Sequence, residues 1–121
     1  MSDLMYVKWY ATVLRQDMFA AEVAAVAPIA LRYGATAYSV QVEQDDRYKI
    51  NQLTWVENHA DWYRFWEGPE MIEFRARLMG KYQVPIVYGW TQEIASGQMG
   101  PSVPTAEPRS DAPQPEPQAT V

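Results

Sequence analysis

The sequence predicts an α+β domain over residues 1–95, a four-stranded antiparallel sheet with two helices on one face, and a Pro-rich tail over residues 96–121. The first reason is the order of patterns, because strand-like alternation and helix-like spacing follow each other as strand, helix, strand, strand, helix, strand. The second is a change of composition, since six of the nine prolines and no aromatic residue lie beyond Ser96.

The first two elements are a strand and a helix. Residues 5–13 alternate apolar and polar side chains, the period of a strand whose two faces meet different surroundings. Asp17 then stands where a helix N-cap is expected, and apolar residues follow at spacings of three and four up to Gly34. Pro28 predicts a kink in this helix, because proline removes a backbone hydrogen bond.

The next two elements are a pair of strands. Residues 36–43 alternate again, and residues 48–56 form a second β-rich run. Only a short polar group, residues 44–47, separates them. Two strands this close together predict an antiparallel hairpin.

The last part of the domain is a helix followed by a strand. Asn58 can cap the helix, which Gly68 and Pro69 divide into two segments. Residues 86–94 then read as the fourth strand. The tail that follows has too few apolar residues to offset its ordering entropy, so we predict disorder there, as a solvated extension or as the carrier of a short recognition motif.

Composition excludes several classes of function. The net charge of −5 argues against nucleic-acid binding, which needs clustered Lys and Arg. The absence of cysteine excludes disulfides, thiolate metal sites and a Cys nucleophile, and one histidine cannot build a paired-His metal site. Without a signal peptide or a bilayer-length apolar stretch, we expect a cytoplasmic protein with no membrane partner.

The sheet face away from the helices should carry aromatic residues. Tyr6, Lys8 and Tyr10 share one face of the first strand. The third strand adds one of two alternating sets, and the pattern does not choose between Tyr48, Ile50, Gln52, Thr54 and Lys49, Asn51, Leu53, Trp55. A face rich in large rings favours cover by a ligand or by a second copy, so we predict a homodimer through the sheet faces.

The stretch over residues 55–69 carries a family resemblance. A strand ends in Trp55, a short polar link contains Glu57 and Asn58, and a helix with an aromatic cluster runs up to Pro69. The chain resembles the dimeric α+β barrel proteins of the antibiotic biosynthesis monooxygenase type, which have a ferredoxin-like βαββαβ fold. The resemblance implies a choice among cofactor-free oxygenases of aromatic polyketides or quinols, heme-degrading monooxygenases, and members with no known activity.

The residues argue against the heme-degrading branch. Those relatives use a helical Trp before Gly-Pro, a His about five residues after the Pro as iron ligand, and an Asn in the first strand. Trp66, or Phe65 in a shifted register, matches the Trp. Phe74 stands at the position of the His and cannot ligate iron, and Tyr10 stands nearest the Asn. We therefore expect neither heme nor another cofactor.

Two groups of residues are candidates for a site. The aromatic side chains suit the walls of a cavity for a flat ligand, while Lys8 and Asn51 would orient a carbonyl or enolate; the aromatic set is Tyr6, Tyr10, Trp55, Trp62, Phe65 and Trp66. His59 and Tyr10 are the candidate catalytic residues, His59 because its pKa suits proton transfer. The alternatives are that the rings are core and dimer interface and that His59 is an exposed first-turn residue.

The carboxylates of the second helical region are interpreted as a solvated polar face, and they are Glu57, Asp61, Glu67, Glu70 and Glu73. The resulting hypothesis is a homodimeric, cofactor-independent monooxygenase-like enzyme that acts on an aromatic, quinol or polyketide-type compound. The alternative is a non-catalytic dimeric module that binds a hydrophobic ligand or a protein.

Overall fold

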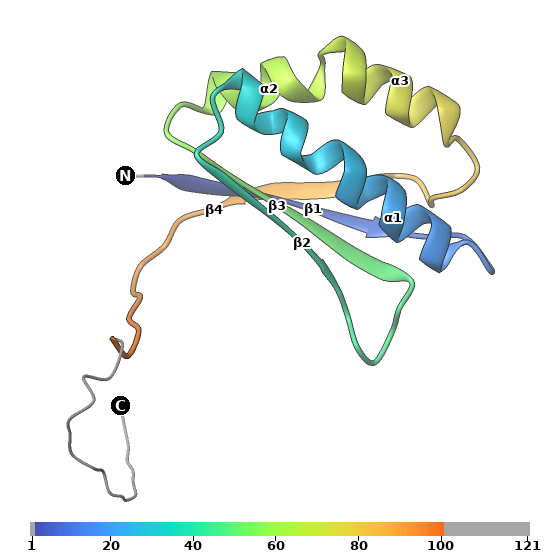
Figure 1. Ribbon diagram of the computed structural model, residues 1–121, viewed down its shortest axis with the longest axis horizontal. Helices are drawn as coiled ribbons and strands as arrows, with labels where there is room; N and C mark the ends of the chain where they lie inside the picture. The colour runs from blue at the N-terminus through green and yellow to red at the C-terminus, as the bar shows by residue number, and fades with distance from the viewer. Residues whose placement is uncertain (1, 101–121) are drawn as a thin grey trace, which may run out of the picture.

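Four antiparallel strands form one sheet, and the helices cover one of its faces (Figure 1). The structure is a computed structural model that describes residues 2–100. Its elements are β1 Asp3–Tyr10, α1 Gln16–Val26, the 3-10 helix η1 Ala27–Tyr33, β2 Ala37–Val42, β3 Lys49–Val56, α2 His59–Trp66, α3 Pro69–Arg77 and β4 Val87–Thr91. The strand order β2-β3-β1-β4 confirms the predicted ferredoxin-like arrangement.

The strands are shorter than the sequence pattern indicates. β1 ends at Tyr10 instead of residue 13, because the chain turns at Leu14, whose φ is 65°. β4 ends at Thr91 instead of residue 94. The predicted hairpin of β2 and β3 is confirmed, with antiparallel pairing from Ala37 opposite Trp55 to Val42 opposite Ile50.

The first helical stretch differs from the prediction at its N-cap and in its helix type after Val26, and it ends at Gly34 as predicted. Arg15 takes the N-cap position, and Asp17 lies in the first turn, where its charge still favours the helix dipole. The kink expected near Pro28 is a change of helix type, because the chain tightens into η1 at Ala27. Gly34 ends η1 with a φ of 110°, a left-handed conformation that favours glycine.

The second helical region divides as predicted. The side chain of Asn58 accepts a hydrogen bond from the Ala60 backbone N–H at 3.0 Å, which fixes the start of α2. The break falls at Gly68, where the chain packs closely on its neighbours. A Cβ placed there would lie 2.8 Å from both the Arg64 carbonyl oxygen and the Tyr33 hydroxyl.

Gly68→Ala is therefore expected to destabilise the protein by about 1–3 kcal/mol through overpacking. Chemical denaturation of the full chain measures the free energy of unfolding. Gly97→Ala is the matched control, since an added Cβ there would meet nothing within 4 Å. Equal unfolding free energies for Gly68→Ala and the wild type would show that the break tolerates a side chain.

The strand register decides which residues face the helices. Lys8 lies opposite Asn51, so the Lys49, Asn51, Leu53 and Trp55 set shares the open face with Tyr6, Lys8 and Tyr10. The other set of β3 lies under the helices, where Ile50, Gln52 and Thr54 are fully buried. This settles the choice that the sequence pattern left open.

The core is a layer of rings and aliphatic side chains between sheet and helices. Trp9 of β1 lies near its centre, with ring centroids 5.4 Å from Phe19 and 5.7 Å from Phe74. Such edge-on and tilted pairs add to the free energy gained by burying large rings. The helix layer is thus fixed to the sheet mainly through aromatic contacts.

The tail predicted over residues 96–121 lies, from residue 101 onward, outside the described residues. Among residues 2–100, no helix combines the length and the apolar character needed to cross a membrane.

Candidate functional site

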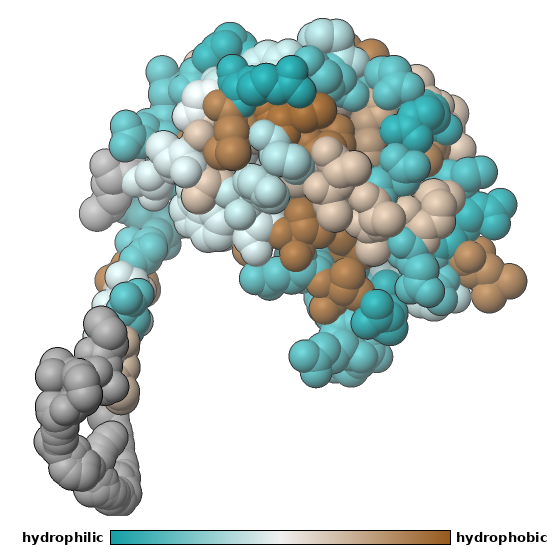
Figure 2. All heavy atoms as spheres, in the orientation of Figure 1, coloured by the Kyte–Doolittle hydropathy of each residue, from teal (hydrophilic) through white to brown (hydrophobic). Residues whose placement is uncertain are grey.

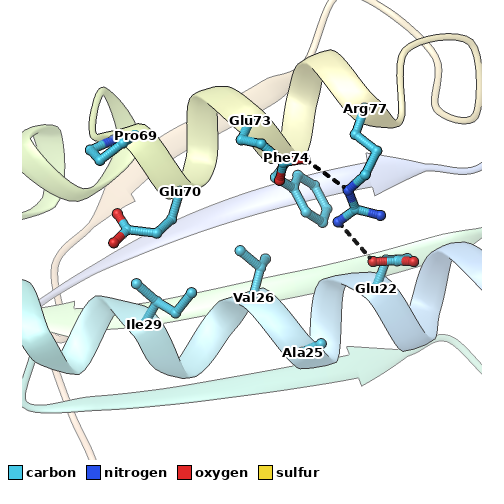
Figure 3. A pocket seen from close by; sticks show the side chains of 9 residues that line it. All are labelled: Glu22, Ala25, Val26, Ile29, Pro69, Glu70, Glu73, Phe74 and Arg77. Atoms are coloured by element: carbon cyan, nitrogen blue, oxygen red, sulfur yellow. Dashed lines mark hydrogen bonds and ion pairs between the residues drawn. The ribbon is translucent and has the colours of Figure 1, made fainter.

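An apolar groove runs between α1 and α3 (Figure 3). Its volume is about 520 Å³, in the range of small-molecule sites. Apolar surface is visible between these helices beneath a row of polar side chains (Figure 2). The lining residues are Glu22, Ala25, Val26, Ile29, Pro69, Glu70, Glu73, Phe74 and Arg77.

One end of the groove is closed by a bridge of charges. The Arg77 guanidinium donates to Glu22 of α1 through Nη2 and to Glu73 of α3 through Nε, both at 3.1 Å. These hydrogen bonds, that to Glu22 foremost, raise the pKa of Arg77. Arg77 therefore joins the two walls of the groove, and its one positive charge is shared between two carboxylates, so this end of the groove keeps one net negative charge.

The other end carries a carboxylate held by a neutral group. The Tyr33 hydroxyl of η1 donates to Glu70 Oε1 at 2.6 Å. This hydrogen bond lowers the pKa of the Glu70 carboxyl and raises the pKa of Tyr33. Glu70 is therefore ionised at neutral pH.

Phe74 forms the floor of the groove and connects it to a buried polar pair, Trp9 and Gln52. The Phe74 ring is 1% exposed and packs on Trp9. Trp9 in turn donates through its indole Nε1 to Gln52 Oε1 at 2.8 Å. The amide Nε2 of Gln52 is buried and has no acceptor among the residues that the structure describes.

A second cluster, Trp66, Trp62 and Arg75, lies next to Trp9 and outside the groove lining. Trp66 lies 5.8 Å from Trp9, and Trp62 stacks on Trp66 at 5.0 Å between ring centroids. The Trp62 Nε1 and the Arg75 Nη1 are likewise buried without an acceptor within residues 2–100. Burial lowers the pKa of Arg75, whose guanidinium lies 4.3 Å from the Trp66 ring centroid. Each of these donors can be satisfied by an ordered water or by an oxygen atom of a ligand.

A second hollow lies on the open face of the sheet. Its volume is about 370 Å³, and Lys8, Tyr10, Asn51 and Lys49 contribute to its lining. Glu43 accepts a long hydrogen bond of 3.5 Å from the Asn51 side chain. This hollow is more polar than the groove between the helices.

Comparison with known proteins gives information only at the level of structure. No family model matches the sequence, and no curated protein matches it. A protein from Nitrosomonas europaea, named as a candidate antibiotic biosynthesis monooxygenase, superposes with a TM-score of 0.69 at 11% identity over 77% of this chain and 90% of its own.

Two further structures agree. SnoaB, a cofactor-independent oxygenase from Streptomyces nogalater solved as a variant, gives a TM-score of 0.66 at 12% identity over 78% of this chain and 95% of its own. Rv0793 from Mycobacterium tuberculosis gives 0.67 at 9% identity over 81% and 100%. The chain has the antibiotic biosynthesis monooxygenase-like fold.

Within this monooxygenase-like fold, the predicted site residues do not form one cavity. The sheet separates them, because strand alternation places Tyr6, Lys8, Tyr10, Asn51 and Trp55 on the open face. The helical spacing of α2 instead turns Trp62, Phe65 and Trp66 into the core, where all three are buried. The expectation of a single aromatic cavity built from both groups is therefore wrong.

The two candidate catalytic residues lie at opposite ends of β1. His59 Nε2 is 2.7 Å from Asp3 Oδ2, and its ring stacks on Trp90 with centroids 3.7 Å apart. Tyr10 lies seven residues further along β1 than Asp3, a distance of roughly 23 Å at the rise of a strand. Within one chain, His59 and Tyr10 therefore do not reach the same small molecule.

The sequence interpretation missed the residues that shape the groove. Tyr33 and Glu70 are 37 positions apart, and no local pattern joins them. The sequence predicts a solvated carboxylate face that includes Glu70 and Glu73. Glu73 is exposed as predicted, but Glu70 is half-buried. The one available signal for Gln52 was a polar side chain in a β-rich run.

Proposed function

We propose that this chain is a cofactor-independent monooxygenase-like enzyme that oxidises an aromatic, quinol or polyketide-type compound bound between α1 and α3. The observation that carries the proposal is the fully buried Gln52, whose amide Nε2 has no acceptor in the described part of the chain and which is linked through Trp9 to Phe74 of the groove lining. The likeness to SnoaB, named a cofactor-independent oxygenase, supports the same class of reaction.

The position of Phe74 also supports the groove as the active centre. Phe74 stands where heme-degrading relatives have their iron-ligating histidine, and it forms the groove floor. Heme itself does not fit here. Phenylalanine offers no lone pair to iron, and the rim carries three carboxylates against one Arg, which disfavours the anionic propionates of heme.

In the proposed reaction the substrate supplies the electrons. A flat substrate lies on the apolar walls of the groove. Rotation of the Phe74 side chain then allows the carbonyl or enol oxygen of the substrate to accept a hydrogen bond from Gln52 Nε2. This donor stabilises the enolate that forms when a substrate C–H gives its proton to water in the open groove.

The remaining steps balance without a cofactor. The enolate carbon transfers an electron to O2, and the two radicals combine into a carbon–oxygen bond. Protonation gives a hydroperoxide, and loss of water leaves a carbonyl at the former methylene carbon. One oxygen atom enters the product, the other leaves as water, and the substrate supplies all four electrons.

Oxygen uptake tests this function. The full chain is incubated with anthrones and dihydroxynaphthalenes in an oxygen-electrode cell, and the rate without protein is subtracted. For the anthrones, which carry the methylene carbon that the proposed steps oxidise, we expect enzyme-dependent uptake with one O2 consumed per carbonyl formed, unaffected by metal chelators. A complete lack of uptake, together with binding of these compounds, would favour the non-catalytic ligand-binding alternative.

We further propose that the chain forms a homodimer through the open face of the sheet. Tyr6, Leu53 and Trp55 lie together on this face without helices over them, and Tyr10 is 38% exposed. A second copy would bury these rings from water. Lys8, Asn51 and Tyr10 would then line a hollow at the interface.

A further inference from the structure

We infer that the groove between α1 and α3 recognises a ligand with a protonated amine on an apolar body, and that Glu70 binds the ammonium group. This inference names the substrate class of the site proposed above and rests on that proposal only for the reaction that follows binding. The charged side chains that line the groove support this inference.

Three carboxylates and one guanidinium lie around the groove, and they are not equivalent. Arg77 pairs with Glu22 and with Glu73 at the same end. Within residues 2–100, Glu70 forms no ion pair, and its hydrogen-bond partner is the uncharged hydroxyl of Tyr33. Glu70 is thus the groove carboxylate that has no cation within ion-pair distance in the described part of the chain, and Arg32 acts on it only from further away, where its charge helps to lower the pKa of Glu70.

The hydrogen bond from Tyr33 also keeps Glu70 in place and ionised. It occupies Oε1, and the Glu70 backbone N–H also donates to the carboxylate, while no further side chain within residues 2–100 does. The carboxylate lies in the first turn of α3, where the helix dipole favours negative charge. A carboxylate held in this state is a weak base but a good partner for a cation.

The two ends of the groove give the ligand a direction. Figure 3 shows Glu70 at one end and the Arg77 bridge at the other, with Val26, Ile29 and Phe74 between them. An ammonium group can pair with Glu70, whereas Glu22 and Glu73 are already paired with the Arg77 guanidinium. The apolar body then lies over Phe74, whose ring packs on Trp9.

Calorimetric titration of the full chain with matched probes tests the inference. The probes are 2-naphthylmethylamine, which is protonated at pH 7, and 2-naphthylmethanol, which has the same shape and no charge. We expect the amine to bind about fivefold more tightly, the size of a partly exposed charge pair. Glu70→Gln should abolish this preference, because the Gln oxygen still accepts from Tyr33 while the charge is lost.

The matched control is Glu57→Gln, which removes the same charge at an exposed position outside the groove and should keep the amine preference. Equal binding of the two probes to the wild type, no binding of either, or a preference that survives in Glu70→Gln would each overturn the inference. The titration involves no oxygen chemistry. Amine preference without oxygen uptake by any quinol would therefore refute only the proposed function, and quinol oxidation without amine preference would refute only this inference.

Discussion

Gln52→Met is expected to lower kcat by about 100-fold on the panel compound that the wild type oxidises, the usual loss when one oxyanion donor is removed. Methionine fills a similar volume but has no N–H to stabilise the enolate oxygen. The loss should appear in kcat and kcat/KM together, because the hydrogen bond strengthens as negative charge develops. Steady-state oxygen uptake over a range of substrate concentrations measures both constants.

Stability must be measured alongside activity, since Gln52 also accepts from Trp9. We expect the free energy of unfolding to change by less than about 2 kcal/mol, because one buried donor is lost while another is left unpaired. Thr54→Val is the control, as it removes a buried hydroxyl from the same strand face away from the groove lining. A Gln52→Met enzyme that retains the wild-type kcat would refute the assigned role of Gln52.

Leu53→Glu is expected to convert the proposed dimer into monomers, with a rise in the dimer Kd of at least about 100-fold. Leu53 pairs with Tyr6 across β3 and β1 on the open face. In a two-fold interface the substitution occurs twice, so two carboxylates would be buried in a surface that now packs apolar side chains. Native mass spectrometry and light scattering over a concentration series report the fraction of dimer.

Ala24→Glu provides the comparison for this experiment, because it adds the same charge at an exposed position of α1. It should leave the dimer fraction unchanged. A wild-type chain that is monomeric at micromolar concentration would contradict the dimer directly. A Leu53→Glu chain that remains dimeric would instead place the interface on another face.

Several elements could be predicted because their causes are local. Asn58 caps α2 through its own side chain, and Gly68 with Pro69 interrupts the helical region without help from distant residues. The hairpin of β2 and β3 follows from two alternating runs and a short polar link. The limits of β1 and β4 were less accurate, since they depend on where the neighbouring strand stops pairing.

The site was harder to predict, because its arrangement depends on residues that are far apart in the sequence. Residue type predicts one cavity for the indole rings of Trp62 and Trp66 and the phenol rings of Tyr6 and Tyr10. In the structure, the sheet lies between the indole rings and the phenol rings. Residue type indicated that rings would gather, but not on which side of the sheet. His59 and Tyr10 were likewise plausible by chemistry and are separated by the length of β1.

The sequence by itself determined the order of elements, the Asn58 cap of α2 and the break at Gly68, because these depend on residues a few positions apart. Only the tertiary structure decided that β3 turns Gln52 inward and Asn51 outward, that Tyr33 meets Glu70, and that Arg77 joins α1 to α3. These pairings depend on strand register and helix packing, which bring together residues far apart in the chain. The candidate site is made of such pairings, so it emerged with the fold.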